Sequence, residues 1–383
     1  MRLHDSANVT DCPPTKRRTL KVREVALADY DEIAELQTAY KRPVKSYEEW
    51  SDLWTQNPVY LSLGGRWPKG WVIERQDGRI VGYLGNIPLF YELGGQRLLT
   101  AVGHAWVVDA KHRPYSLALL DLYFSQKKVD LFLNATVGPA GHDCFSVFGS
   151  PRVPTGDWGR SAFSITNRQG FLAAWLAEKS IPFTGPLSFG LAGALGIVQA
   201  FSSRASHRNG AGHSFELCKN IDSRFDVFWE GLRKNNPNLL LAVRNREVLE
   251  WHFKYPLRSD QVWILTAGAN PICAYAIFLR YDNPAARLTR MRLIDYQALD
   301  GTTDLLAPML AWALERCRRE GIHMFECIGF RPEKMRVINE LSTYGRKLPC
   351  WMFFYKTPHP KLAEKLADPN AWDPSQFDSD ASL

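Results

Sequence analysis

The sequence predicts a mixed α/β protein, of the α+β kind, with two tandem domains that each contain a mostly antiparallel mixed sheet flanked by helices. The first observation is length, because 383 residues are enough for two hydrophobic cores. The second is an alternation of strand and helix patterns that occurs once in each half of the chain. The third is spacing, because the two clearest hairpins lie about 190 positions apart, which indicates two copies of one unit.

The first domain is expected over residues 20–178, after a flexible basic arm at residues 1–19. Alternating apolar and polar residues from Leu20 are typical of a strand, and Asp29 is a suitable N-cap for the helix that follows. The turn Asp77-Gly78 between two apolar runs predicts a hairpin. The remaining expected elements are a strand at 96–108, a helix from Ser116 and a strand at 129–137.

The second domain is expected over residues 213–358, with the same order of patterns. Its hairpin turns at Gly268-Ala269-Asn270, and a strand that includes Asp295, a long helix and a strand that ends near Cys327 follow. Residues 359–383 form an acidic tail, which we expect to be disordered.

Residues 179–212 are predicted to be an apolar, glycine-rich linker between the domains. No charged residue occurs from Ser180 to Ser203, but glycine and serine dilute the apolar run, and Pro182 and Pro186 interrupt its start. An ordinary buried helix, a helix at a membrane interface and a membrane-spanning helix stay open as alternatives. Peripheral membrane contact through residues 186–201 stays open with them.

Composition limits the function classes. A hydrophobic fraction of 45% with 23% charged residues is that of a globular protein and excludes wholesale disorder. The net charge of +7 suits an anionic small molecule or a membrane surface, without the dense basic patch that nucleic acid requires. The seven cysteines show no CxxC spacing, so we expect no metal site, and their odd number without a signal sequence predicts a cytoplasmic protein.

One segment carries a chemical signal. A strand ends at Val108, a basic turn follows, and a helix opens at Ser116. Unpaired backbone N–H groups at such a helix start, together with the Arg113 side chain, are suited to hold a pyrophosphate. We therefore expect the bend from Val108 to Ser116 to offer exposed main-chain amides to a diphosphate.

This segment resembles the GNAT superfamily of acyl-CoA-dependent N-acyltransferases, whose Arg/Gln-x-x-Gly-x-Gly/Ala turn holds the CoA pyrophosphate. Arg113 and Ala118 fit that turn, Ser116 replaces the first glycine, and Pro114 removes one N–H donor. The order of elements looks most like the tandem-GNAT proteins of polysaccharide assembly and distantly like the Fem-type aminoacyltransferases. The stretch from Asp295 to Asp304 lacks such a turn, so the second copy is expected to be degenerate as a CoA site.

The resemblance implies acyl-CoA as co-substrate, no metal, and a set of binding residues. That set is Trp106, Val107, Val108, Arg113, Pro114, Tyr115, Ser116, Leu117, Ala118 and Asn134. His104 on the same strand is a candidate general base, since imidazole titrates near pH 6.5, with a packed strand histidine as the alternative. Tyr115, Tyr123 or Cys144 are candidate acids for the leaving thiolate, with structural roles as the alternative.

The predicted function is therefore transfer of an acetyl or other acyl group from acyl-CoA to an amine or hydroxyl. The partners are a small-molecule acyl donor and a polar acceptor: an amino sugar, a sugar nucleotide, a polysaccharide unit or an amino-acid-like metabolite. Two alternatives stay open, a Fem-type aminoacyltransferase acting on a cell-wall precursor and a non-catalytic double-GNAT scaffold. Against the Fem-type reading, the sequence contains no heptad arm.

Overall fold

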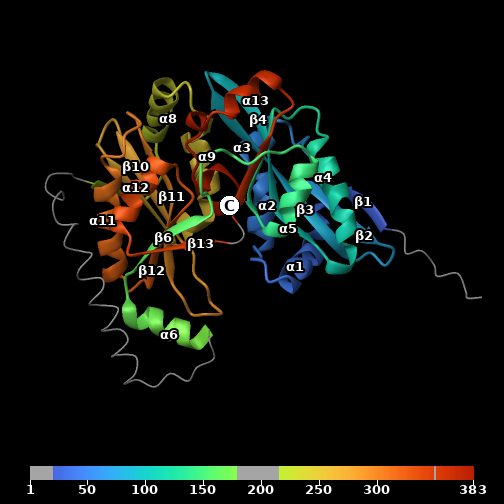
Figure 1. Ribbon diagram of the computed structural model, residues 1–383, viewed down its shortest axis with the longest axis horizontal. Helices are drawn as coiled ribbons and strands as arrows, with labels where there is room; N and C mark the ends of the chain where they lie inside the picture. Colours follow the sequence, from blue (N-terminus) through green and yellow to red (C-terminus); the bar gives the residue numbers. More distant parts are fainter. Residues whose placement is uncertain (1–19, 179–214, 349–350) are drawn as a thin grey trace, which may run out of the picture.

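The computed structural model describes residues 20–178, 215–348 and 351–383. The predicted arm at residues 1–19 and linker at residues 179–212 lie outside the described residues. Two sheets lie side by side, one in each half of the molecule, with helices on their outer sides and between them (Figure 1). The predicted mixed α/β class with two sheets is confirmed.

The first sheet has the strand order β1-β2-β3-β4-β5-β14, and β8 pairs with β3. Its strands are β1 (Leu20–Glu24), β2 (Gly70–Arg75), β3 (Ile80–Leu93), β4 (Gln96–Val108), β5 (Leu131–Val137), β8 (Leu241–Ala242) and β14 (Met352–Lys356). The hairpin between β2 and β3 turns at Gly78, whose φ of 83° lies in the left-handed region that glycine adopts without strain. The long strand predicted at 96–108 is β4.

The second sheet has the strand order β13-β6-β12-β11-β10-β9-β7. Its strands are β6 (Arg160–Ile165), β7 (Phe215–Cys218), β9 (Val262–Ala267), β10 (Ala274–Arg280), β11 (Arg290–Ala298), β12 (Met324–Ile328) and β13 (Tyr344–Lys347). Nearly every residue of β9 to β12 is buried, so this sheet is covered on both faces.

The two sheets share one topology. β2, β3 and β4 pair antiparallel and β5 then pairs parallel with β4, while β9, β10, β11 and β12 repeat this order. Each sheet is completed by an antiparallel strand from the other half of the chain, because β6 pairs with β12 and β14 pairs with β5. The predicted boundaries, residues 20–178 and 213–358, therefore cut across an exchange of strands: β6 belongs to the second sheet and β14 to the first. Pairing partners are non-local, so the pattern within a strand does not reveal its sheet.

Twelve α-helices cover these sheets within the described residues. They are α1 (Tyr30–Ala39), α2 (Tyr47–Thr55), α3 (Pro58–Ser62), α4 (Ser116–Phe124), α5 (Pro139–Val147), α6 (Arg168–Glu178), α8 (Arg224–Asn235), α9 (Arg246–His252), α10 (Lys254–Arg258), α11 (Leu306–Arg319), α12 (Pro332–Leu341) and α13 (Pro360–Leu366). Local sequence fixes several of their starts: Ser46 and Glu49 form a capping box at α2, and the Asn57 side chain caps α3.

The expectation of a disordered acidic tail is wrong. Beyond α13 the chain enters the space between the two sheets, where the end marked C lies (Figure 1). Trp372 and Phe377 are buried, and 3-10 turns η5 (Gln376–Asp378) and η6 (Asp380–Ser382) carry the chain onward. The acidic residues have specific partners, since Asp373 pairs with Lys334 and Asp378 with Arg244. Composition indicated a solvated tail because these two cations lie far away in the sequence.

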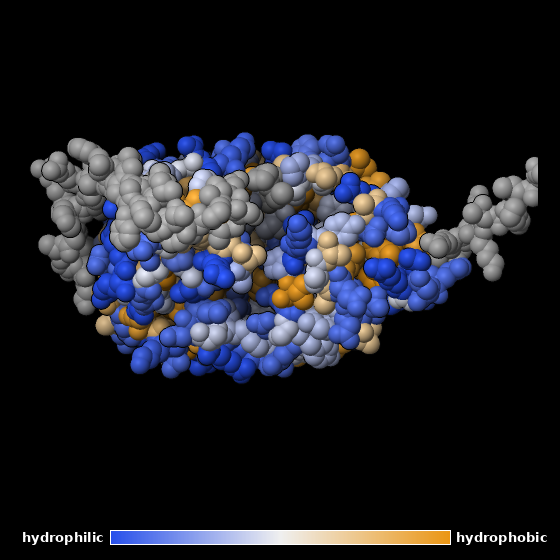
Figure 2. All heavy atoms as spheres, turned by 90° about the horizontal axis from the view of Figure 1, so that it is seen from below, coloured by the Kyte–Doolittle hydropathy of each residue, from blue (hydrophilic) through white to orange (hydrophobic). Residues whose placement is uncertain are grey.

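No helix among the described residues is long and apolar enough to cross a membrane. On the face shown in Figure 2, hydrophilic side chains cover most of the described surface, and hydrophobic residues occur in scattered groups.

Candidate active site

The first sheet opens where β4 and β5 separate. The parallel pairing between them covers only Thr100 to Val102 opposite Leu131 to Leu133, although β4 continues to Val108 and β5 to Val137. A cavity of about 1140 Å³ begins in this opening and extends to the second sheet. Its walls include the ends of β4 and β5 that no longer pair with each other, the starts of α4 and α5, and parts of α2 and α10. Asp380 to Leu383 of the tail complete the wall.

A bulge in β4 faces this cavity. Gly85 of β3 pairs with His104 and Tyr83 with Val107, so β4 has one more residue than β3 in this stretch. Ala105 has a φ of 51°, which is uncommon for a residue other than glycine. A bulge leaves an extra residue outside the ladder, and both Ala105 and Trp106 line the cavity. The backbone of Ala105 and Trp106, at the bulge, is therefore exposed to the cavity side of β4.

His104 lies in the cavity wall beside a residue of the tail. Its Nδ1 is 3.7 Å from Oδ2 of Asp380, and the two side chains are 11% and 9% exposed. Nδ1 is buried without a hydrogen-bond partner among the described residues, because 3.7 Å is too long for that bond. Catalytic hydrogen bonds are often long before substrate binds. The sequence does not predict a role for Asp380, because it lies in the segment expected to be disordered. Only the folded chain brings it beside His104.

Asn134 lies at the point where the two strands separate, and it is 6% exposed. Its Nδ2 donates to the Tyr123 hydroxyl at 3.3 Å, and that hydroxyl lies 2.8 Å from the carbonyl oxygen of Ala101. A Cβ on Gly103 would collide with Oδ1 of Asn134, which explains the glycine there. Burial raises the pKa of Tyr123 well above its ordinary value. The Tyr123 hydroxyl is thus bonded on both sides of the opening, and Tyr123 is not among the residues that line the cavity, so the structure does not bring it to a leaving group there.

The two other candidate acids differ in position. Tyr115 is 46% exposed and is not part of the cavity wall, so the structure does not bring it to His104. Cys144 on α5 lines the cavity. Burial raises the pKa of the Cys144 thiol, and the negative charge of Asp143 adds to this shift. A protonated thiol can donate to a leaving thiolate, whereas a cysteine nucleophile requires a lowered pKa.

The predicted CoA-binding residues fall into two groups. Those that line the cavity are Trp106, Val108, Arg113, Pro114, Ser116, Leu117 and Asn134. Val107, Tyr115 and Ala118 are not among the lining residues, and Val107 packs into the core of the first sheet. The predicted residues that line the cavity therefore lie on the side of the bend that faces it.

The bend itself is less open than predicted. Residues Ala110–Tyr115 form a 3-10 helix, η2, whose N-cap is Asp109. Several of its amides are already bonded: Asp109 to the Val81 carbonyl, Ala110 to the Tyr40 hydroxyl, Lys111 and His112 to Asp109, and Ser116 to the Arg113 carbonyl. The prediction of exposed amides is wrong for residues 109–112. An anion here would instead meet the Arg113 side chain and the amino end of α4.

The wall toward the second sheet contains residues that sequence reasoning did not select. Tyr255 donates to Oδ2 of Asp52 at 2.6 Å, and both line the cavity. Nε2 of His252 lies 2.8 Å from the Ser382 hydroxyl, and burial lowers the pKa of His252 to about 3. His252 is therefore neutral at neutral pH. No pattern around these positions indicated a site.

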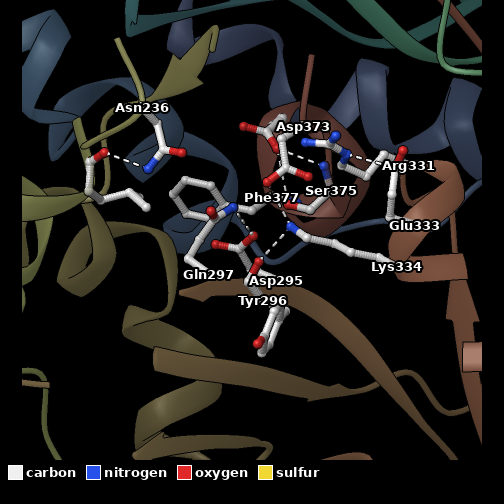
Figure 3. Close-up of polar contacts among 12 residues, drawn as sticks. Asn236, Asp295, Tyr296, Gln297, Arg331, Glu333, Lys334, Asp373, Ser375 and Phe377 are labelled. Atoms are coloured by element: carbon white, nitrogen blue, oxygen red, sulfur yellow. Dashed lines mark hydrogen bonds and ion pairs between the residues drawn. The ribbon is translucent and has the colours of Figure 1, made fainter. Parts of the chain in front are cut away.

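The second sheet has a matching opening that the chain itself fills. Parallel pairing of β11 with β12 ends at Leu293 and Cys327. The Gln376 side chain lies in this opening, 3.4 Å from the carbonyl oxygens of Leu293 and Ile328. Figure 3 shows Asp295, Lys334 and Asp373 converging on the same region, where Lys334 bonds to Asp373 and to the Tyr296 carbonyl.

Asp295 has the position in β11 that His104 has in β4, the second residue after the parallel pairing ends. It bonds to Arg244 at 2.9 Å and to Tyr275 at 2.7 Å, and Arg244 also bonds to Asp378. Burial opposes ionisation of Asp295, but Arg244 and the two hydrogen bonds outweigh it and lower the pKa of Asp295. The histidine position of the first sheet is thus a buried structural carboxylate in the second.

No group of three or more His, Cys, Asp or Glu side chains in the described residues is arranged to hold a metal ion. The groups that line the cavity include an imidazole beside a carboxylate, a thiol, a bulged strand and several cationic side chains.

The solved structures with a similar fold include N-acyltransferases. N-myristoyltransferase from Saccharomyces cerevisiae with bound myristoyl-CoA matches with a TM-score of 0.55 and 10% identity, over 99% of this chain and 89% of that chain. A GCN5-related N-acetyltransferase from Anabaena variabilis ATCC 29413 matches with a TM-score of 0.52 and 11% identity, over 88% of this chain and 73% of that chain. A probable N-acyltransferase from Enterococcus faecalis V583 has a TM-score of 0.52, 10% identity and coverage of 88% and 73%.

At these identities the likeness shows the fold alone, which this chain shares with a GCN5-related N-acetyltransferase and with N-myristoyltransferase. No protein-family model matches the sequence, and no curated protein matches it.

Proposed function

We propose that the protein is an acyltransferase that moves an acyl group from acyl-CoA to an amine or hydroxyl of a small polar acceptor. The observation that carries this proposal is the open end of the first sheet, where His104, Asp380 and the bulge at Ala105 line one cavity with Arg113. The neighbouring folds support the choice of acyl-CoA as donor. The proposed acceptor belongs to one of four classes: amino sugars, sugar nucleotides, polysaccharide units or amino-acid-like metabolites.

In this proposal Arg113 and the amino end of α4 bind the CoA diphosphate, and the thioester lies between β4 and β5. The N–H groups at Ala105–Trp106 polarise the thioester carbonyl. Nδ1–H of His104 points to Asp380, which leaves Nε2 free to accept a proton. Asp380 is thus a positioning residue for the base.

The reaction then balances in one transfer. The acceptor nitrogen or oxygen forms a bond to the thioester carbon, its proton passes to His104, and the carbon–sulfur bond breaks. The thiolate takes up a proton, for which Cys144 is the candidate donor, and the products are the acylated acceptor and free CoA. No metal takes part in these steps as proposed.

The test is release of free thiol from acetyl-CoA and longer acyl-CoAs in the presence of a panel of amine and hydroxyl acceptors. We expect His104→Ala to lower kcat by about 10²- to 10⁴-fold without changing CoA binding, the range of general-base catalysis. A His104→Ala enzyme that retains the wild-type rate and pH profile would eliminate the proposed base. The matched control is His359→Ala, which alters a half-exposed histidine on Asp130 outside the cavity.

A further inference from the structure

The cavity wall formed by the second sheet contains an arginine that the transfer chemistry does not use. Arg292 lies on β11 and its side chain is only 8% exposed. Nε donates to Oε2 of Glu326 at 2.9 Å. Within residues 20–178, 215–348 and 351–383, this is the only hydrogen bond of the Arg292 side chain, so its two terminal nitrogens keep their N–H groups for another partner.

Two aromatic rings lie near this guanidinium. Its central carbon lies 4.2 Å from the ring centroid of Tyr281 and 6.0 Å from that of Trp351. Both aromatic residues line the cavity together with Arg292. A guanidinium that lies over an aromatic ring and keeps the N–H groups of both terminal nitrogens can bind a carboxylate or a phosphate in a bidentate manner.

Positive charge exceeds negative charge around Arg292. Glu326 is shared with Arg346, whose Nη2 lies 2.6 Å from Oε1. Burial lowers the pKa of Arg290, and the neighbouring charge of Arg292 lowers it further. Arg280, in the cavity wall, pairs with Asp282 at 2.7 Å. Because Glu326 is shared with Arg346, which does not line the cavity, it does not fully neutralise Arg292, and Arg292 can accept an additional anion from the cavity side.

We propose that the acceptor carries an anionic oxygen group, a carboxylate or a phosphate, which binds to the Arg292 guanidinium at the second-sheet end of the cavity. This inference rests on the proposed function, and it narrows the acceptor class. Amino-acid-like metabolites and sugar nucleotides carry such a group, whereas a neutral amino sugar does not. The donor diphosphate would use Arg113 at the first-sheet end, so the two anions have separate sites.

The experiment is calorimetric titration of the full chain, saturated with desulfo-CoA, with matched pairs of probes. One pair is glucosamine 6-phosphate and glucosamine, and the other is alanine and alaninamide. We expect the charged member of at least one pair to bind at least about tenfold more tightly, since charge-assisted hydrogen bonds have this strength. The pair that responds distinguishes a phosphate from a carboxylate.

Arg292→Gln should remove that preference and weaken binding of the charged probe by about 10- to 100-fold, with desulfo-CoA binding unchanged. Arg346→Gln is the matched control, because it removes the other cation on Glu326 but does not line the cavity. If Arg292→Gln does not bind desulfo-CoA, Arg292→Lys is used in its place. Lysine keeps the positive charge but lacks the bidentate guanidinium, so we expect a loss of affinity for the charged probe that lies between those of the wild type and a protein without the charge.

Three results would overturn the inference: charged and neutral probes that bind alike, an Arg292→Gln protein that keeps the preference, or an equal loss in Arg346→Gln. Failure of the wild-type protein to bind desulfo-CoA would instead refute the proposed function. The two failures are therefore distinguishable in the same titrations.

Discussion

The two sheets open in the same way, where two parallel strands separate, but one opening is a cavity and the other is filled by the chain. Between β4 and β5 the strands separate into a cavity with His104 in its wall, and between β11 and β12 they separate around the Gln376 side chain. One segment, residues 368–383, accounts for both states: it fills the second opening and brings Asp380 to the first. The comparison teaches that the same separation of strands can hold a cavity or be filled by the chain, depending on where the C-terminal segment lies.

The largest expected effect is on stability, in the second opening. Arg244 is fully buried and bonds to Asp295 and Asp378, so Arg244→Ala would leave two buried carboxylates without their cation. We expect a loss of about 3–5 kcal/mol in the free energy of unfolding. Urea denaturation measures it, with Arg318→Ala, which breaks an exposed pair with Glu315, as the control expected to lose less than about 1 kcal/mol. A loss below that of the control would show that the network does not support the fold.

The next effect is on activity, in the first opening. Asp380→Asn should lower kcat by about 10- to 100-fold, because the imidazole loses the carboxylate that orients it and stabilises its charge. The acidic limb of the pH–rate profile should shift to lower pH, because the imidazolium loses a neighbouring negative charge, and Asp380→Glu should restore part of the rate. Asp295→Asn, at the matching position of β11, should leave the kcat of the folded enzyme unchanged. An Asp380→Asn enzyme with wild-type kcat and pH profile would remove the distinction between the two openings.

A smaller effect concerns the dependence of stability on pH near the junction of α9 and the tail. Burial lowers the pKa of His252 to about 3, whereas an unfolded histidine titrates near 6.5. The unfolded chain therefore binds this proton first, and the contribution of His252 to stability is fully present above pH 6.5 and is lost as the pH falls toward 3.

At pH 5 the loss amounts to about 2 kcal/mol, from about 1.4 kcal/mol for each pH unit. Denaturation at pH 7.5 and pH 5 should show His252→Gln losing about 2 kcal/mol less than the wild type. Equal losses in the two proteins would mean that burial does not hold His252 neutral in the folded chain.

The smallest effect concerns the residue that fills the second opening. The two contacts of Gln376 are long, at 3.4 Å each, so Gln376→Ala should cost only about 1 kcal/mol by urea denaturation. Ser375→Ala, which removes a hydroxyl that accepts from Phe377 and bonds to Asp378, offers a comparison within the same turn. A much larger loss in Gln376→Ala would mean that the side chain supports the splayed strands more strongly than its geometry indicates.

Local sequence was sufficient for the elements and for one wall of the site. The hairpin at Gly78, the strand that is β4 and the helix that begins at Ser116 all depend on period and on turn residues close in the chain. His104 and Asn134 could be selected because they lie on strands that lead to and from that helix, and both line the cavity.

The parts that sequence reasoning missed depend on pairings between distant positions. The strand exchange places β6 and β14 in each other's half, and no pattern within five or six residues records that choice. The composition of the tail predicts solvated charges at Asp378 and Asp380. Their neighbours, Arg244 for Asp378 and His104 for Asp380, approach them only in the folded chain. The amides of residues 109–112 were counted as open, since Asp109 gave no sign that it would cap the turn.

We propose that acyl-CoA binds in the first opening and not in the second, and calorimetric titration of the full chain with desulfo-CoA decides between them. We expect one molecule per chain, with affinity reduced at least about tenfold in Arg113→Ala and unchanged in Gln376→Ala. A stoichiometry of two, an Arg113→Ala protein that binds as tightly as the wild type, or no binding at all would contradict it.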